Sequence, residues 1–271
     1  MRDEECVAFL RWALPRLRMR WPGFRRVRRQ VCRRMARRVS ELGLAGAPAY
    51  RRYLEAHPQE WRRLDECLHI SVSRFYRDRA VFDDLGRHVL PELAGAARAR
   101  GAGALVAWCA GCASGEEPYS LALLWRFTVA ADFPDLAFSV VASDIDRGLL
   151  ARAHRACFGA GSMKELPADW REAAFEPSGR LLCLREAFRQ GVTFRLQDLR
   201  RARPKGRFDL VLCRNLAFTY FDEGLQADVL ERLRAALRPG GALVLGRGER
   251  VAEEGRGFGE WSEAHGVYRR T

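Results

Sequence analysis

Apolar residues in the first third of the chain recur at helical spacing. One predicted helix carries its apolar side chains at intervals of four, four, four and three residues, at Val27, Val31, Met35, Val39 and Leu42. Such spacing places them on one helical face, and Gly43 stands where a helix C-cap is expected. Two more helices are predicted at 47–56 and 58–69. We therefore predict that residues 1–90 form an all-α N-terminal domain.

From Gly103 onward the pattern changes to short apolar runs that alternate with helical stretches. The runs lie at 104–109, 138–143, 192–196, 208–213 and 242–246. They lack strict alternation, which is typical of strands buried on both faces of a parallel sheet. The intervening helices, at 118–129, 147–155 and 225–237, predict a doubly wound, mostly parallel, Rossmann-like α/β sheet. This second domain spans 91–271, and 98–103 is the best candidate for a linker.

Composition adds the broad class and a possible kind of partner. The 271 residues are 48% hydrophobic and 30% charged, as in ordinary globular proteins. No apolar run approaches the roughly 18 residues that span a bilayer, and the N-terminal sequence does not resemble a secretory signal. We expect a cytoplasmic protein without membrane insertion. The sequence does not determine the oligomeric state, and a monomer is favoured. The net charge of +13, mostly from arginine, indicates either an anionic partner or a codon bias without functional meaning.

The eight cysteines are scattered, and most lie within apolar runs. We expect them to be reduced and to fill the core and loops. Cys109 and Cys112 have CxxC spacing, but no second CxxC and no HxxxH accompanies them. The sequence therefore predicts no metal site.

The sequence WCAGCASGEEPYS follows the first predicted strand and opens a helix. Gly111 and Gly115 flank a tight turn where the backbone can approach a ligand closely. The turn lacks the GxGxxG pattern and the lysine of phosphate-binding loops. Glu116 and Glu117 would repel a pyrophosphate but suit a cation, such as a sulfonium that carries an amino acid group. The alternative is that both are ordinary first-turn residues that favour the helix dipole.

Polar side chains also follow the later strands of the predicted sheet. Asp144 ends the second strand, where a carboxylate can accept hydrogen bonds from ribose hydroxyls, and Asp146 is placed to cap the next helix. Asp198 follows the third strand, where it could reach an adenine amino group. Three further polar residues lie near the end of the fourth strand, at Arg214, Asn215 and Tyr220. The carboxyl ends of parallel strands meet at one edge, so we expect a nucleoside site there.

Several motifs in a fixed order identify a family. They are ISVSRFYRD, AGCASGEEPYSLAL, ASDID, CRN…YFD, LRPGG and the closing GVYRR. With them the chain resembles the CheR-type chemoreceptor glutamate methyltransferases from about residue 8 to 270. The resemblance implies a Rossmann-like methyltransferase domain behind an N-terminal helical domain, with a small β insert at about 176–195.

The resemblance also implies an activity. The family transfers a methyl group from S-adenosylmethionine to receptor glutamates, leaving S-adenosylhomocysteine. Because a carboxylate is already ionised near pH 7, no general base is needed, and catalysis depends on alignment. The implied partners are acidic helices of chemoreceptor-like proteins, and the arginine-rich N-terminal helices would attract them.

The resemblance implies a set of site residues as well. Arg77 and Tyr220 resemble residues near the transferred methyl group. The implied cofactor contacts come from the linker segment, the glycine loop and the strand ends, at Ser71, Ser73, Arg77, Gly111, Glu116, Asp144, Asp198, Leu199, Arg214 and Asn215. Among them, Glu116 resembles the ligand of the methionine amino group, and Asp144 the ligand of the ribose. Asp198 and Leu199 resemble the adenine contacts.

The sequence departs from the family pattern in four places. Ser73 replaces the usual Thr, and Tyr76 replaces the usual Phe. RNLAFTYFD has one extra residue before Tyr220, and LGRGE, ending at Glu249, replaces LGHSE. Two alternatives stay open. One is a nucleic-acid methyltransferase, although no Asn/Asp-Pro-Pro-aromatic motif follows the fourth strand, so nucleic acid is not the expected partner. The other is a non-catalytic module that binds S-adenosylmethionine or S-adenosylhomocysteine and signals to a partner.

Overall fold

The computed structural model describes residues 2–251, 257–262 and 265–271. The chain divides into two compact units. The first comprises Met1–Ser71 and Thr219–Gln226, and the second Val72–Phe218 and Ala227–Thr271. The division after Ser71 differs from the boundary near residue 90 that the sequence indicated. Within the described residues, no helix combines the length and the apolar character needed to cross a membrane.

The first unit is helical, as predicted. Its helices are α1 (Asp3–Ala13), η1 (Leu14–Leu17), α2 (Trp21–Phe24), α3 (Arg28–Glu41), α4 (Ala47–Ala56) and α5 (Glu60–Leu68). The predicted apolar stripe is buried on α3 at Val31, Met35 and Val39. Gly43 follows with a φ of +66°, so its predicted place at the end of this helix is confirmed.

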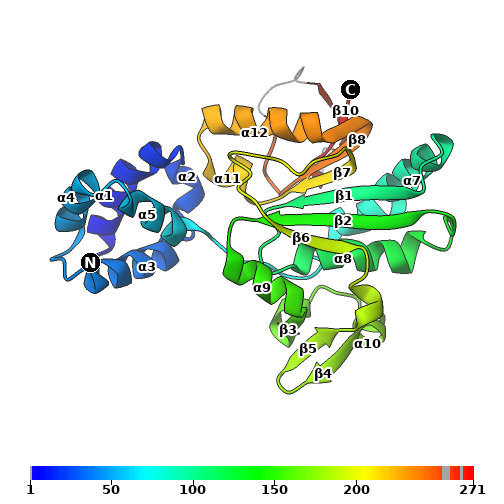
Figure 1. Cartoon of the computed structure of the whole chain (residues 1–271), viewed down its shortest axis with the longest axis horizontal. Coiled ribbons are helices and arrows are strands. Elements are labelled where there is room, and N and C mark those ends of the chain that lie inside the picture. The colour runs from blue at the N-terminus through cyan, green and yellow to red at the C-terminus, as the bar shows by residue number, and fades with distance from the viewer. Residues whose placement is uncertain (1, 252–256, 263–264) are drawn as a thin grey trace. The chain divides into compact units, whose positions relative to one another are not determined.

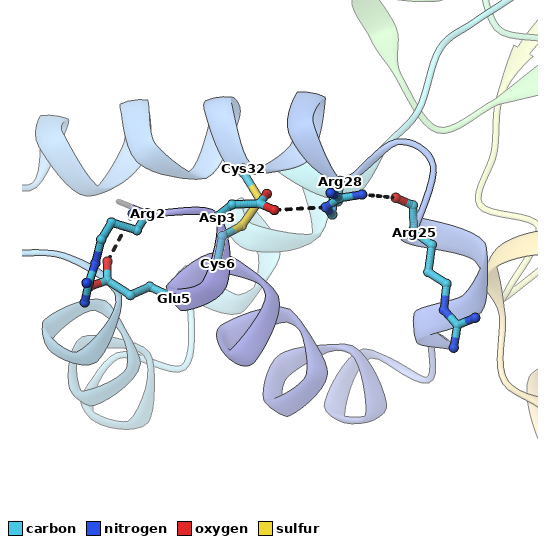
Figure 2. Close-up of a disulfide and its surroundings, with 7 residues drawn as sticks. All are labelled: Arg2, Asp3, Glu5, Cys6, Arg25, Arg28 and Cys32. Carbon is cyan, nitrogen blue, oxygen red and sulfur yellow. Dashed lines mark hydrogen bonds and ion pairs between the residues drawn. A yellow bond between two sulfur atoms is a disulfide. The ribbon is translucent and has the colours of Figure 1, made fainter.

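A disulfide joins two of these helices (Figure 2). It connects Cys6 of α1 to Cys32 of α3 across a Cα–Cα distance of 5.9 Å, which lies in the ordinary range for disulfides. Arg28 of α3 also donates to Asp3 of α1 at 3.2 Å, close to this bridge. The prediction that these two cysteines are reduced was wrong, because helix packing brings together residues 26 positions apart.

The second unit is built on a seven-stranded sheet in the order β6-β2-β1-β7-β8-β10-β9. The strands are β1 (Ala104–Ala110), β2 (Ala137–Asp144), β6 (Val192–Leu196), β7 (Phe208–Cys213), β8 (Leu237–Leu245), β9 (Phe258–Ser262) and β10 (Val267–Arg270). The first five are parallel to one another, and β10 is antiparallel to β8 and β9. The predicted mostly parallel sheet is therefore confirmed.

Helices cover both faces of this sheet, with α8 and α9 on one face and α12 on the other (Figure 1). The helical segments that lie wholly in this unit are α6 (Arg79–Asp84), η2 (Leu85–Val89), α7 (Leu90–Ala99), α8 (Glu116–Leu124), η3 (Trp125–Val129), α9 (Arg147–Arg155), η4 (Ala160–Met163), α10 (Ala168–Ala174) and η5 (Glu186–Phe188). Two further helices, α11 (Ala217–Tyr220) and α12 (Glu223–Ala236), have residues in both units. The segment 98–103, expected as a linker, lies inside this unit, between α7 and β1.

The predicted β insert is a separate three-stranded antiparallel sheet in the order β3-β5-β4. Its strands are β3 (Cys157–Gly159), β4 (Phe175–Ser178) and β5 (Leu181–Leu184). The insert therefore begins earlier than the predicted residue 176, and residues 192–195 belong to β6 of the main sheet. A second disulfide, Cys157–Cys183, joins the paired strands β3 and β5. The prediction of reduced thiols was wrong for this pair too, since strand pairing places the two residues opposite each other.

Candidate active site

The loop between β1 and α8 is shaped by two glycines in the left-handed region. Gly111 has a φ of +80° and Gly115 a φ of +96°. A Cβ at Gly115 would lie 2.9 Å from the Cβ of Ala153 on α9, so only glycine allows the loop to approach that helix. The amides of Gly111 and Cys112 donate to the Ser143 carbonyl at 2.8 and 3.0 Å. The loop is thus held against the end of β2.

Asp144, at the end of β2, connects three neighbouring strand ends. Its Oδ2 accepts from the Ala113 amide in the β1–α8 loop at 2.9 Å. Its Oδ1 accepts from the Asp146 amide at 2.9 Å, and its carbonyl accepts from the Gln197 amide after β6 at 2.9 Å. The predicted helix cap is confirmed, because the Asp146 side chain accepts from the Gly148 and Leu149 amides in the first turn of α9. The carboxylate of Asp144 is therefore fixed at the edge where ligands bind in such sheets.

The two glutamates that open α8 have different surroundings. Glu116 is 4% exposed and accepts a hydrogen bond from Ser114 Oγ at 2.8 Å, inside its own loop. Glu117 Oε2 accepts from Arg214 Nη1 at 3.2 Å, toward the end of β7. Burial raises the pKa of Glu117, and the Arg214 guanidinium opposes part of that rise. The sequence pointed to both acids as suited to a cation, but the site residues implied by the resemblance included Glu116 alone, because no sequence signal tells which of two adjacent acids bonds to Arg214.

Two buried aromatic residues anchor the segment that carries Arg77. The Phe75 amide donates to the Ser162 carbonyl at 2.8 Å, and the Phe75 ring packs edge-on against Phe158 and Phe175 of the insert. The Tyr76 amide donates to Ser120 Oγ of α8 at 2.8 Å.

The surroundings of Tyr76 explain one departure from the family pattern. Tyr76 stands where phenylalanine is usual, and its hydroxyl donates to Asp83 Oδ1 at 3.2 Å. The added oxygen therefore has a partner, as a buried hydroxyl requires. Arg77 follows directly, and its Nη1 donates to the Val72 carbonyl at 3.0 Å.

Arg214, at the end of β7, joins this segment to α8. Its side chain is 2% exposed. Nη2 donates to the Arg77 carbonyl at 2.8 Å and to Asp78 Oδ2 at 2.7 Å, and Nη1 reaches Glu117. The guanidinium also lies 5.4 Å from the centre of the Phe82 ring. The structure therefore brings the predicted residues Arg77 and Arg214 together, with Asp78 and Glu117 as additional members of the cluster.

The remaining predicted residues have more varied surroundings. Leu199 is buried, whereas Asp198 is paired with Arg200, whose Nε lies 3.0 Å from Oδ1. If Asp198 contacted adenine, its carboxylate would therefore bind the adenine amino group and the Arg200 guanidinium at the same time. Ser73 is half-buried in the second unit. Asn215 follows Arg214 with a φ of +56°.

Two predicted residues belong to the first unit, Ser71 and Tyr220. The Tyr220 ring lies 5.0 Å from the ring of Phe24, centre to centre, and its carbonyl accepts from the Arg20 amide at 2.9 Å. The roles of Ser71 in cofactor binding and of Tyr220 near the methyl group stay predictions.

The cysteines near the strand ends are not suited to nucleophilic chemistry. Cys109, Cys112 and Cys213 are free and buried, as predicted, and burial raises the pKa of each thiol. A neutral thiol is a weak nucleophile and a poor metal ligand. Among the described residues, no group of three or more His, Cys, Asp or Glu side chains is arranged to hold a metal ion.

The polar groups at this edge fit S-adenosylmethionine. The carboxylate of Asp144 can accept from ribose hydroxyls, and the acids at the first turn of α8 suit a cationic amino acid group. The glycine turn allows the backbone to approach a ligand. Fold and site together define an S-adenosylmethionine-dependent methyltransferase.

Comparison with known proteins identifies the family. Residues 71–266 match the model described as "CheR methyltransferase, SAM binding domain". The chain is 32% identical over 236 residues to a probable chemotaxis protein methyltransferase from Rhizobium etli, covering 83% of this chain and 85% of the relative. It is 30% identical to the chemotaxis protein methyltransferase of Escherichia coli, covering 85% and 79%. The chain belongs to the CheR methyltransferase family.

The likeness to one solved methyltransferase structure is weaker. The N-methyltransferase NodS from Bradyrhizobium japonicum, in complex with S-adenosylhomocysteine, aligns with a TM-score of 0.33 and 14% identity, covering 63% of each chain. Likeness at this level carries no argument about function, so the assignment rests on the sequence matches and the site.

Proposed function

We propose that this protein transfers a methyl group from S-adenosylmethionine to glutamate side chains of chemoreceptor-like proteins. The observation that carries the proposal is the match to chemotaxis protein methyltransferases over more than four fifths of the chain. S-adenosylmethionine supplies the methyl group, and the glutamate carboxylate accepts it, which gives a methyl ester and S-adenosylhomocysteine without any proton transfer.

The residues at the strand ends support this chemistry by what they hold in place. A carboxylate acceptor is ionised near neutral pH, so the site needs no general base. Its main task is to align the reactants, and the buried cluster around Arg214 gives Arg77 a fixed backbone position. We propose Arg77 and Tyr220 as the residues near the transferred methyl group. Glu117 joins Glu116 as a candidate for binding the methionine amino group.

The partner in this proposal is an acidic helix of a chemoreceptor-like protein. The first unit exposes a series of arginines on and beside α3, at Arg25, Arg26, Arg29, Arg33 and Arg37. Such a surface would attract an acidic helix, and its attraction would weaken with salt. A monomeric protein in the cytoplasm belongs to the same proposal. The two disulfides count against a cytoplasmic location, since disulfides are rare in that compartment.

The test is a methylation assay with purified protein, methyl-labelled S-adenosylmethionine and soluble cytoplasmic fragments of chemoreceptors. We expect label on the fragment that is released as methanol in mild base, as a glutamyl ester requires. Label that survives mild base would refute the glutamate acceptor. Label on added nucleic acid alone would favour the first alternative, and cofactor binding without turnover on any acidic helix would favour the second.

Two arginine variants, one at the site and one on the surface, test whether the measured methylation depends on the site. We expect Arg77→Ala to lower turnover at least about tenfold, as is typical for loss of a positioned charge. The exposed Arg247 provides a charge-matched control, and Arg247→Ala should leave turnover nearly unchanged.

A further inference from the structure

Glu249 makes two contacts that the sequence did not suggest. It lies in the turn after β8, where its amide donates to the Gly246 carbonyl at 2.9 Å. Its side chain turns back, and one oxygen, Oε2, accepts from the Gly246 amide at 2.7 Å and from the Asn215 amide at 2.8 Å. The residue is 6% exposed. A single buried carboxylate oxygen therefore connects the ends of the adjacent parallel strands β7 and β8.

The partner of this contact, Asn215, has an unusual backbone. Its φ of +56° lies in the left-handed region, which asparagine adopts more readily than most residues other than glycine but which still departs from the usual backbone. A backbone amide at such a position still needs a hydrogen-bond acceptor. Glu249 Oε2 supplies that acceptor. Asn215 directly follows Arg214, so its conformation determines how the chain leaves the cluster that holds Arg77.

Gly246 makes this arrangement sterically possible. A Cβ at residue 246 would lie 2.6 Å from Glu249 Oε2 and 2.8 Å from the Asn215 nitrogen. Any side chain there would push the carboxylate away from both amides. In the LGRGE segment, Gly246 and Glu249 thus carry the contact, whereas Arg247 and Gly248 are exposed. The two residues that differ from the family's LGHSE pattern lie outside it.

We propose that Glu249 is a positioning residue that fixes Asn215 in its left-handed conformation for cofactor binding. This inference rests on the proposed role of Asn215 at the S-adenosylmethionine site. In this proposal the effect of Glu249 depends on one oxygen that is close enough to accept hydrogen bonds from two amides. A purely electrostatic role is the competing explanation, because the Glu249 charge, after burial, contributes to the raised pKa of the neighbouring Cys213 thiol.

Two substitutions separate reach from charge. Glu249→Gln keeps the length and one carbonyl oxygen that can accept both bonds, but it removes the charge. Glu249→Asp keeps the charge but is one methylene shorter, so it cannot reach both amides. We would titrate S-adenosylhomocysteine into the wild-type protein and each variant by calorimetry, with thermal unfolding to show that each is folded. Arg247→Ala is the control for a change in the same turn.

We expect Glu249→Gln to bind within about threefold of the wild-type affinity and Glu249→Asp to bind at least about tenfold more weakly, as the loss of one charge-assisted bond implies. The opposite ranking would overturn the proposal in favour of charge. If both variants kept the wild-type affinity but unfolded at a lower temperature, the proposal would be overturned, because Glu249 would then stabilise the fold without affecting cofactor binding. Failure of the wild-type protein to bind S-adenosylhomocysteine would instead refute the proposed function, so the two failures are distinguishable.

Discussion

Arg214 Nη2 lies 2.7 Å from Asp78 Oδ2, and the Arg214 side chain is 2% exposed while that of Asp78 is 26% exposed. The pair connects the end of β7 to the segment that carries Arg77. Breaking this pair leaves the buried Arg214 guanidinium with Glu117 as its other acidic partner, so the cation loses part of its counter-charge, which is costly in a buried position. The left-handed φ of +62° at Asp78 is one that asparagine tolerates, so the charge can be removed without backbone strain.

The first prediction follows from this pair. Asp78→Asn should lower the free energy of unfolding by about 2 kcal/mol, a typical value for a hydrogen bond to a charged group. It should also weaken S-adenosylhomocysteine binding, because the Arg77 segment loses an anchor. Urea unfolding and calorimetry measure the two effects. Asp135→Asn is the matched control, since Asp135 lies at the same 2.7 Å from Arg98 but both side chains are exposed; it should change stability by less than about 1 kcal/mol.

The second prediction concerns Gly115 in the β1–α8 loop. Gly115→Ala would adopt an unfavourable positive φ and bring a methyl group against Ala153 of α9. We expect destabilisation of at least about 1 kcal/mol and reduced cofactor affinity, because the loop must move. Gly95→Ala in α7 meets no neighbour within 4 Å and should be neutral or stabilising. Equal effects of the two substitutions on binding would contradict a special role for this loop.

Local signals in the sequence predicted much of the fold. The bounds of β6, β7, α4 and α9 agree with the apolar runs and the cap residues, because such patterns act over a few neighbouring positions. The start of β8 was placed too late, at residue 242. LRPGG looks like a turn, yet the strand begins at Leu237 with a register shift against β7.

Features that depend on distant parts of the chain could not be predicted. Nothing in the spacing of Cys6 and Cys32 indicates that α1 packs against α3. Nothing in GEEP indicates that Glu117, rather than Glu116, bonds to Arg214, a residue 97 positions away. The contact of Glu249 with Asn215 depends on the parallel pairing of β7 and β8. In each case the sequence supplies the residue type, and packing decides its partner.

The third prediction concerns the disulfide of the first unit. A bridge that closes a loop of this length, with its ends 26 positions apart, stabilises by about 3 kcal/mol in the chain-entropy model. Cys6→Ser with Cys32→Ser should therefore lower the unfolding free energy by roughly that amount under oxidising conditions. Reductant should destabilise the wild type more than the double variant, in which Cys157–Cys183 is the remaining bridge that reductant can break. Cys67→Ser is the control, because Cys67 is a free thiol in the same unit. Titration of all eight cysteines as free thiols in the unfolded, unreduced protein would contradict the bridge.

Glu60 gives the first unit a pH dependence whose direction follows from its contacts. Arg38 donates to both carboxylate oxygens at 2.8 Å, and the Tyr50 hydroxyl donates to Oε1 at 3.0 Å. The Arg38 hydrogen bonds lower the pKa of Glu60 below its ordinary value of 4.5, against the effect of burial. A carboxyl with a lowered folded-state pKa stabilises the fold above the unfolded-state pKa. That stability is lost as the pH falls toward the folded-state value.

The fourth prediction uses this direction. At pH 7, Glu60→Gln should be less stable than the wild type by about 2 kcal/mol, and the difference should shrink as the pH falls below about 4.5. Urea unfolding at a series of pH values measures it. Glu66→Gln on the same helix is the control, because Glu66 pairs with Arg63 at 2.9 Å but is 42% exposed; surface pairs contribute less than about 1 kcal/mol. A Glu60→Gln deficit that is constant from pH 7 to pH 3 would mean that packing, not the ionised carboxylate, is the source of the stability.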